Sequence, residues 1–408
     1  MAIQEIKRDM GNIAKNWKKL SGETYWKDAL DPPSPDLRTY INHYGEMAEA
    51  TYDAYIQVTP SKNAGNVKYA RKNLLEKVGL LKGQPLNQYK VTKYMYATSA
   101  VILPGAFVTS SDPHAWSRKS NWIGFTAVAT DEGKKALGRR DILVAWRGTV
   151  NPSDMIHDSE FKLVSAPIIF GENHKDDPKV HEGWYSIYTT NDLNTRYNKT
   201  SARDQAMEEV KKLVKEYEHE DISLTLTGHS MGAAVAALMA LDIVIHGFNK
   251  LATAPPKVCP VTVFAFATPK VGDSSFKKVF DSMKQLYCLR INNSPDVVPK
   301  YPLLGYSDVG TELVIDTLKS PYLKGPGNPG IWHNMEGYLH GVAGVQTSLF
   351  RRFNLEINRD ISLVNKFGDI LEDKYGIPGF WFTERNNGMV QKEDGSWELK
   401  DHEEDNDP

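Results

Sequence analysis

The sequence has little cysteine, no excess of charge of either sign and no long apolar run. Only Cys259 and Cys288 are cysteines among 408 residues, which excludes a disulfide framework and indicates two buried thiols. Lysine plus arginine number 49 and aspartate plus glutamate 51, so there is no strong field for nucleic acid or an anionic membrane. Any contact with a membrane would therefore be local and apolar.

Targeting signals are also lacking. No apolar segment reaches the roughly 18 residues that a membrane-spanning helix needs. The first twenty residues contain neither the apolar core nor the small-residue cleavage site of a secretory signal. We therefore expect no membrane span and a cytoplasmic location. A length of 408 residues with 41% hydrophobic composition allows a sizeable core.

The pattern of the sequence divides the chain into three regions. Residues 1–90 carry apolar side chains at helical spacing, with Ser34 or Asp36 as a helix N-cap, and predict an N-terminal helical region packed on the core. Residues 91–350 hold short apolar runs that alternate with helical stretches after about 150. This predicts an α/β fold with a mainly parallel sheet covered by helices on both faces. Residues 351–408 are expected to form a C-terminal helix and a solvated acidic tail.

A single hydroxyl stands between two glycines at the end of one predicted strand. The run "LTLTGHSMGAAVAALMALDIVI" passes from a β-branched strand through Gly228, Ser230 and Gly232 into a long apolar helix. Gly-x-Ser-x-Gly alone is a weak signal, but a strand before it and a helix after it are the context of a nucleophile elbow. The glycines remove Cβ atoms where chains come close, and the strained turn exposes the Ser230 hydroxyl. The alternative is a tight turn with an incidental serine.

The acid that a serine nucleophile requires is expected after a later strand. "LYCLRINNSPDVVP" supplies Asp296 just past such a strand, and we favour it. Asp273 lies one strand too early, whereas Asp308 and Asp316 fall in a less clearly patterned stretch. The alternative for Asp296 is a turn or capping aspartate beside a proline.

The base must be a histidine that follows the acid in the chain. Three candidates exist: His333, His340 and His402. His333 ends a loop before a predicted helix and can reach the top of the sheet, whereas His340 lies within that helix and His402 in the acidic tail. We favour His333 as the base and expect His229, beside the nucleophile, to be a packing residue.

Two backbone N–H groups are expected to form an oxyanion hole. The N–H of Met231 lies at the positive end of the helix that follows the nucleophile. A second donor should come from the end of an earlier strand. "ILVAWRGTV" ends at Gly148, which permits close approach, and Thr149 supplies the candidate N–H. An ordinary strand-end turn is the alternative.

These motifs together resemble the class 3 (fungal-type) triacylglycerol lipase family of α/β-hydrolases. The matching segments are "AWRGT", "VHEGWYSIY", "GHSMG", "FATPKVGD", "NNSPDVVP" and "HNMEGYLH". The flanking segments "NWKKLSGETYWKDALDP", "YGEMAEATYDAY", "SNWIGFTAVATDEG" and "GSWELKDHEED" are similar to the plant phospholipase A1 type II enzymes. The resemblance runs from about residue 15 to 405.

The resemblance implies hydrolysis of the sn-1 acyl ester of glycerophospholipids with no metal and no cofactor. It places Ser230, Asp296 and His333 on the triad positions and Thr149 and Met231 on the oxyanion positions. The chain departs from many relatives in the lid segment, where Met155 and Ile156 stand in place of an aromatic residue. A lid there is one interpretation, and an ordinary surface loop is the other.

Other functions remain compatible with the sequence. The same chemistry could act on galactolipids, monoacylglycerols or other esters, because the shape of the pocket decides the substrate. The chain could also be a catalytically silent lipase-like scaffold. The expected partner is a phospholipid or other lipid ester, with peripheral membrane contact and no nucleic acid. The oligomeric state cannot be read from the sequence.

Overall fold

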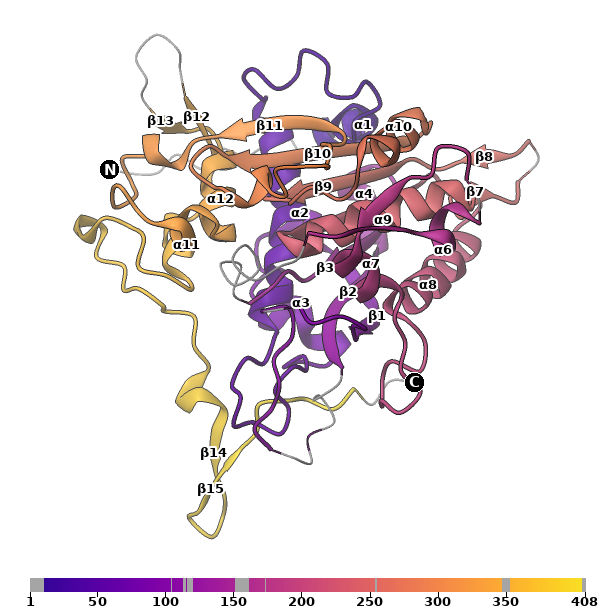
Figure 1. Ribbon diagram of the computed structural model, residues 1–408. Helices are drawn as coiled ribbons and strands as arrows, with labels where there is room; N and C mark the ends of the chain where they lie inside the picture. The colour runs from indigo at the N-terminus through magenta and orange to yellow at the C-terminus, as the bar shows by residue number, and fades with distance from the viewer. Residues whose placement is uncertain are drawn as a thin grey trace.

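A seven-stranded mixed sheet forms the centre of the computed structural model (Figure 1). The structure describes residues 11–103, 105–112, 115, 120–150, 161–172, 174–253, 255–346 and 353–405. The spatial order is β1-β2-β3-β6-β9-β10-β11, antiparallel between the first three strands and parallel from β3 onward. The strands are β1 (Tyr89–Ala97), β2 (Asn121–Ala129), β3 (Arg140–Trp146), β6 (Ile222–His229), β9 (Val261–Phe266), β10 (Leu286–Asn293) and β11 (Thr311–Ile315).

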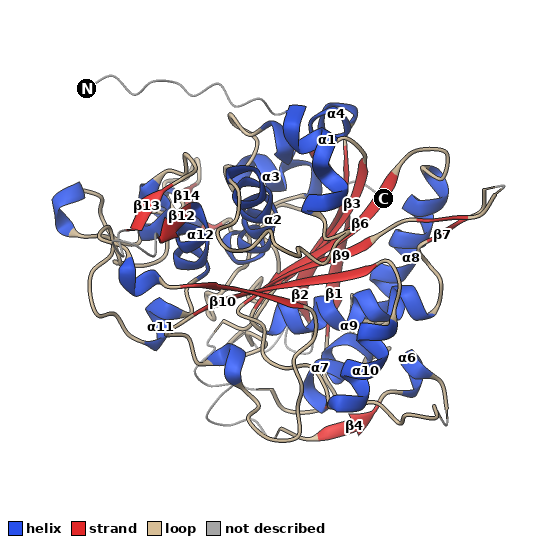
Figure 2. Cartoon of the chain, turned by 90° about the horizontal axis from the view of Figure 1, so that it is seen from above, coloured by secondary structure: helices blue, strands red, loops and turns tan. Residues whose placement is uncertain are grey.

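Helices cover both faces of this sheet (Figure 2). One hydrophobic cluster joins the sheet to α7 (Glu182–Thr189), α8 (Ala202–Glu216), α9 (Met231–Ile245) and α10 (Ser274–Ser282). The other joins it to α1 (Gly11–Leu20), α2 (Pro35–Asp53), α4 (Asp131–Leu137) and α12 (Met335–Ala343). In β3, Ile142 and Val144 face the first cluster, and Leu143 and Ala145 face the second. This period-two alternation buries both faces and, with the strand order, confirms the predicted α/β fold with a mainly parallel sheet covered by helices.

Shorter elements complete the described chain. They are α3 (Leu74–Lys77), α6 (Pro167–Phe170), α11 (Pro329–Trp332) and the two-stranded pairs β4 (Leu163–Ser165) with β5 (Lys179–His181), β7 (Lys250–Leu251) with β8 (Lys257–Val258), β12 (Gly344–Gln346) with β13 (Phe353–Leu355), and β14 (Met389–Gln391) with β15 (Trp397–Leu399). Among the described residues, none of the helices combines the length and apolar character that crossing a bilayer demands.

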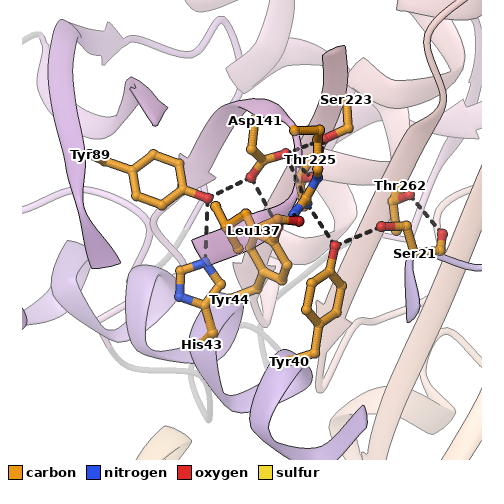
Figure 3. A network of polar contacts seen from close by, with 11 residues as sticks. Ser21, Tyr40, His43, Tyr44, Tyr89, Leu137, Asp141, Ser223, Thr225 and Thr262 are labelled. Atoms are coloured by element: carbon orange, nitrogen blue, oxygen red, sulfur yellow. Dashed lines mark hydrogen bonds and ion pairs between the residues drawn. The ribbon is translucent and has the colours of Figure 1, made fainter. Parts of the chain in front are cut away.

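A buried polar network fixes α2 against the sheet (Figure 3). Ser34 caps the helix by accepting from the N–H of Leu37, and Pro35 occupies its first turn. Further along, the Tyr44 hydroxyl donates to Asp141 at 2.9 Å, and Asp141 forms an ion pair with the fully buried Arg139 at 3.3 Å. Burial alone would raise the pKa of Asp141, but Arg139 and the donating hydroxyls hold it below its usual value. The remaining donors to Asp141 are Tyr89, Ser223 and Thr225.

Residues 353–405, the described part of the C-terminal region, do not contain the helix that the sequence predicted. The helical elements there are short 3₁₀ turns at Ile361–Asn365, Asp373–Tyr375 and Arg385–Gly388, and the strands are β13 and the β14–β15 hairpin. The reason is local: Gly376, Pro378 and Gly379 interrupt any helix, and Asn386 and Asn387 adopt positive φ angles of 54° and 51°.

The acidic tail is docked on the protein, contrary to the expectation of a solvated end. Glu403 accepts hydrogen bonds from the backbone N–H of Ala70 and from the side chain of Asn73. Asp405 forms an ion pair with Arg71 at 2.5 Å, and the His402 Nδ1 lies 2.7 Å from the carbonyl oxygen of Val67. The tail therefore finds its partners in residues 63–73, a region that charge patterning along the sequence cannot identify.

Candidate active site

The strand-to-helix turn at Ser230 has the backbone geometry of a nucleophile elbow. Ser230 lies between the end of β6 and the start of α9 and has φ 58° and ψ −131°. A positive φ is unfavourable for a residue with a Cβ, so this turn persists only because packing on both sides enforces it. The Ser230 N–H donates to the carbonyl oxygen of Phe266 at 2.8 Å, which ties the elbow to the neighbouring strand β9.

Close backbone packing explains the glycines of the elbow. A Cβ atom on Gly228 would lie 2.4 Å from the carbonyl carbon of Gly232. A Cβ on Gly232 would lie 2.3 Å from the carbonyl oxygen of Trp146, at the end of β3. No other residue fits at either position without moving the backbone. The glycines therefore bring the start of α9 against the end of β3, where residues 147–149 form the turn that the sequence predicts to supply an oxyanion donor and that we call the oxyanion turn.

Asp296 and His333 form a buried pair at the same edge of the sheet. Asp296 follows β10, and its Oδ2 lies 2.7 Å from His333 Nδ1. Both side chains are almost fully buried, at 1% and 5% exposure. The Tyr338 hydroxyl donates to the same Oδ2 at 2.6 Å, and the Val298 N–H donates to Oδ1 at 3.0 Å. This arrangement holds a histidine with its Nδ1 proton toward the carboxylate and its Nε2 as a proton acceptor.

His229, the neighbour of Ser230, packs against His333, but no hydrogen bond joins Ser230 to His333 in the described chain. The Ser230 Oγ and the His333 Nε2 are both buried and without a hydrogen-bond partner among the described residues. The ring of His229, next to Ser230, lies 4.5 Å from the ring of His333. Hydrogen bonds between catalytic groups are often long before substrate binds, so the arrangement is compatible with proton transfer.

Thr149 and Met231 flank the same elbow. Thr149 is 2% exposed, and its Oγ1 has no partner among the described residues. The preceding residue, Gly148, would place a Cβ 3.3 Å from the Ser230 Cβ and 2.5 Å from the carbonyl oxygen of His229. Met231 is the first residue of α9, so its N–H has no partner within the helix. Two backbone donors can therefore face one oxygen beside Ser230.

A buried arginine shapes the oxyanion turn, and sequence reasoning did not single it out. The Arg147 guanidinium donates to the carbonyl oxygens of Gly148, Trp122 and Ala106 at 2.6, 3.0 and 3.0 Å. Its carbon also lies 3.9 Å from the centre of the Tyr55 ring. An arginine can fix three carbonyl groups at once because its donors form a rigid fork.

Two further residues hold the acid and the histidine together. The Asn293 Nδ2 donates to the carbonyl oxygen of Trp332, directly before His333, and the Asn293 N–H donates to the Tyr338 hydroxyl. Tyr338 thereby links the end of β10 to Asp296. Burial and the nearby Asp296 raise the pKa of Tyr338 well above its usual value, so its hydroxyl stays neutral while it accepts from Asn293 and donates to Asp296. Asn293 stands directly before the "SPD" turn, which is the only sequence signal for either role.

The competing candidates have other partners. Asp273 caps α10 by accepting from the Phe276 N–H, and Asp308 lies 3.1 Å from Arg290. Asp316 caps the turn at 317–319. His340 lies 2.7 Å from the Ser320 hydroxyl and His402 contacts Val67, as described above. Met155 and Ile156 lie outside the described residues, so the lid stays a prediction.

The mixed sheet, the elbow and the buried histidine–aspartate pair define the class of protein, an α/β-hydrolase. A family model described as lipase (class 3) matches residues 143–306. Among solved structures, Lip2 lipase of Yarrowia lipolytica has a TM-score of 0.43 and 18% identity over 68% of this chain and 78% of that one. The lipase of Rhizopus microsporus var. chinensis has a TM-score of 0.43 and 22% identity over 67% and 72%.

Closer relatives extend over nearly the whole chain. Phospholipase A1-II 1 of Oryza sativa subsp. japonica is 51% identical over 399 residues, which cover 98% of this chain and 99% of that protein. Phospholipase A1-IIgamma of Arabidopsis thaliana is 50% identical over 393 residues, which cover 96% and 94%. The chain therefore belongs to the plant phospholipase A1-II family, and the resemblance found in the sequence is confirmed.

Proposed function

We propose that this protein is a phospholipase A1 that hydrolyses the sn-1 acyl ester of glycerophospholipids, with Ser230 as nucleophile. The observation that carries the proposal is the strained Ser230 at the turn from β6 to α9, beside a buried His333–Asp296 pair at 2.7 Å. Family membership supports the substrate class. A packing role alone does not explain why a serine hydroxyl and an imidazole nitrogen are both buried without partners in the described part of the chain.

The proposed reaction proceeds in two steps. The Ser230 Oγ attacks the ester carbonyl carbon while its proton passes to His333 Nε2, and the Thr149 and Met231 N–H groups donate to the oxyanion. His333 then gives the proton to the leaving lysophospholipid oxygen, which leaves an acyl-enzyme. Water, deprotonated by the same Nε2, attacks the acyl carbon, and His333 returns that proton to the Ser230 Oγ as the fatty acid is released. Asp296 orients the ring and stabilises the imidazolium in both steps.

We further propose that the loop after Asp296 contacts the lipid surface. Leu303 and Leu304 in this loop are 63% and 87% exposed, and Val297 is 36% exposed. The loop packs on the segment before β4, since the Tyr306 hydroxyl donates to the Phe161 carbonyl oxygen at 3.2 Å. Because the net charge is nearly balanced, membrane attachment requires a local apolar contact, and exposed leucines beside a lipid-processing site provide one.

The nucleophile is tested with a lipid panel and a fluorophosphonate probe. The wild-type protein should release the sn-1 acyl chain, leaving a 2-acyl lysophospholipid by mass spectrometry, and should be labelled at Ser230. Ser230→Ala should lose both labelling and turnover. Labelling elsewhere, or activity retained in Ser230→Ala, would favour the scaffold interpretation. Release of the sn-2 chain alone would contradict the assigned position.

The membrane contact is tested with the double variant Leu303→Ser/Leu304→Ser. Its hydrolysis of a soluble short-chain ester should match the wild type, whereas its binding to phosphatidylcholine vesicles and its rate on them should fall at least tenfold. Val258→Ser is the control. Val258 is 46% exposed in β8, which precedes the amino end of β9, whereas the site lies at the carboxyl ends of the parallel strands. Unchanged vesicle binding of the double variant would refute this surface.

A further inference from the structure

One tyrosine of the N-terminal region reaches the active site from outside the segment that matches the lipase family. Tyr52 lies in the last turn of α2, and its hydroxyl is 2.9 Å from the Nδ1 of His229 in the elbow. The same hydroxyl receives a hydrogen bond from the backbone N–H of Gly148 in the oxyanion turn. The close approach at Gly148 is needed here too, because a Cβ there would lie 2.1 Å from the Tyr52 oxygen.

The groups themselves determine the direction of the Gly148 hydrogen bond and favour one direction for the bond to His229. A backbone N–H can only donate, so the Tyr52 oxygen accepts from Gly148 and its own O–H is free to donate to His229 Nδ1. Neutral His229 then carries its proton on Nε2, which lies beside the backbone of His333 without a hydrogen-bond partner among the described residues. Burial, together with the nearby His333, holds the pKa of His229 well below its usual value, so the ring stays uncharged.

The His229 ring is also in contact with His333, the proposed base. It packs on His333 with ring centres 4.5 Å apart and planes inclined by 46°, and it lies 5.9 Å from the ring of Tyr338. One hydroxyl group therefore connects three parts of the site: the turn carrying Thr149, the elbow carrying Ser230, and the ring surface against which His333 rests.

We propose that Tyr52 is a positioning residue for ester hydrolysis. Its hydroxyl holds the oxyanion turn and the His229 ring in register, so that the Thr149 N–H and His333 keep their places around the Ser230 Oγ. This inference rests on the proposed function above. It also makes the N-terminal helical region part of the active site, although the match to the lipase family covers only residues 143–306.

The test is Tyr52→Phe in the full-length protein. Phenylalanine keeps the ring contact with His229, whose centre is 5.7 Å away, and removes only the hydroxyl. Displacements of about 1 Å in a catalytic arrangement can cost up to about 100-fold in rate. We expect kcat on a soluble ester to fall about ten- to a hundredfold while KM changes less than about threefold. The rate of fluorophosphonate labelling of Ser230 should fall in parallel.

A matched variant separates positioning from stability. Tyr94→Phe also removes a buried hydroxyl, which donates to the Tyr69 carbonyl oxygen at 2.8 Å far from the elbow. Both variants should lower the melting temperature, but only Tyr52→Phe should lower kcat. If Tyr52→Phe keeps kcat within twofold of the wild type, or if Tyr94→Phe loses kcat equally, the positioning role is wrong.

A second variant covers the case in which Tyr52→Phe does not fold. His229→Asn retains an oxygen acceptor for the phenol but lacks the ring against His333, and we expect a comparable loss of kcat. Wild-type kcat in His229→Asn would overturn the inference. Failure of the proposed function looks different, because the wild-type protein itself would then not be labelled at Ser230.

Discussion

Replacing Asp296 with asparagine tests the proton arrangement of the site most directly. The carboxylate accepts three hydrogen bonds, from Val298 at Oδ1 and from His333 and Tyr338 at Oδ2. An amide has one acceptor and one donor end. If its oxygen faces His333, its NH₂ opposes the Val298 N–H, and two buried donors lose their partners at about 1–3 kcal/mol each.

The opposite orientation takes the acceptor from one buried donor only, the Tyr338 hydroxyl, and is therefore favoured. Its oxygen keeps the Val298 N–H, and its NH₂ faces His333 Nδ1, which must then give up its proton. The proton moves to Nε2, and His333 can no longer accept the proton of Ser230. A wrong tautomer of this kind costs a serine hydrolase about 10⁴-fold in kcat, or about 5.4 kcal/mol of barrier. KM should change little, because the tautomer matters only when the proton moves.

Initial rates of phospholipid hydrolysis, measured beside a thermal melt, check this prediction. Asp308→Asn is the control, because Asp308 is half-exposed, pairs with Arg290 and has no contact with His333. It should retain wild-type kcat. A folded Asp296→Asn protein that keeps more than a tenth of wild-type kcat would show that this carboxylate does not orient the base.

Two further predictions concern stability. Gly232→Ala places a Cβ 2.3 Å from the Trp146 carbonyl oxygen and should lower the free energy of unfolding, measured in urea, by about 3 kcal/mol or more. Gly337→Ala is the control, because the nearest atom to its Cβ is 3.5 Å away, and it should leave the free energy of unfolding unchanged. Equal effects of the two substitutions would contradict the close approach at Gly232. His181 accepts a hydrogen bond from the Gly183 N–H, and burial lowers the pKa of its imidazole to about 4. The unfolded chain therefore binds a proton at this histidine as the pH falls below about 6.5, whereas the folded protein does not. Stability is lost over this range, until the folded protein also binds the proton near pH 4. From pH 7 to pH 5 the wild type should lose about 2 kcal/mol relative to His181→Asn, which keeps the acceptor without titrating, and a pH-independent difference would refute this.

The sequence by itself determined the features that depend on neighbouring residues. The β-branched run before Gly228 and the apolar run after Gly232 predicted a strand, a tight turn and a buried helix, because each pattern has the period of its element. Chain order and loop position were enough to choose Asp296 and His333, which the structure brings to 2.7 Å of each other. The Ser34 cap was likewise readable, since a cap is a contact across three residues.

Local patterns misled where partners are distant. A helix was expected after residue 351 and a solvated tail at the end, but the tail meets residues 63–73 across more than 300 positions of sequence. A run of charged residues indicates that a segment can be solvated, but it does not identify the distant backbone groups that need a hydrogen-bond acceptor.

Only the tertiary structure decided how the site is held. Tyr52 meets His229 across 177 residues, Asn293 meets Trp332 across 39, and Tyr338 meets Asp296 across 42. Such contacts arise because two independent elements, α2 and α12, pack on the same sheet and bring their polar side chains to one edge. Periodicity specifies which face of an element is buried, whereas the position and angle at which the elements meet follow from how all the buried side chains fit together.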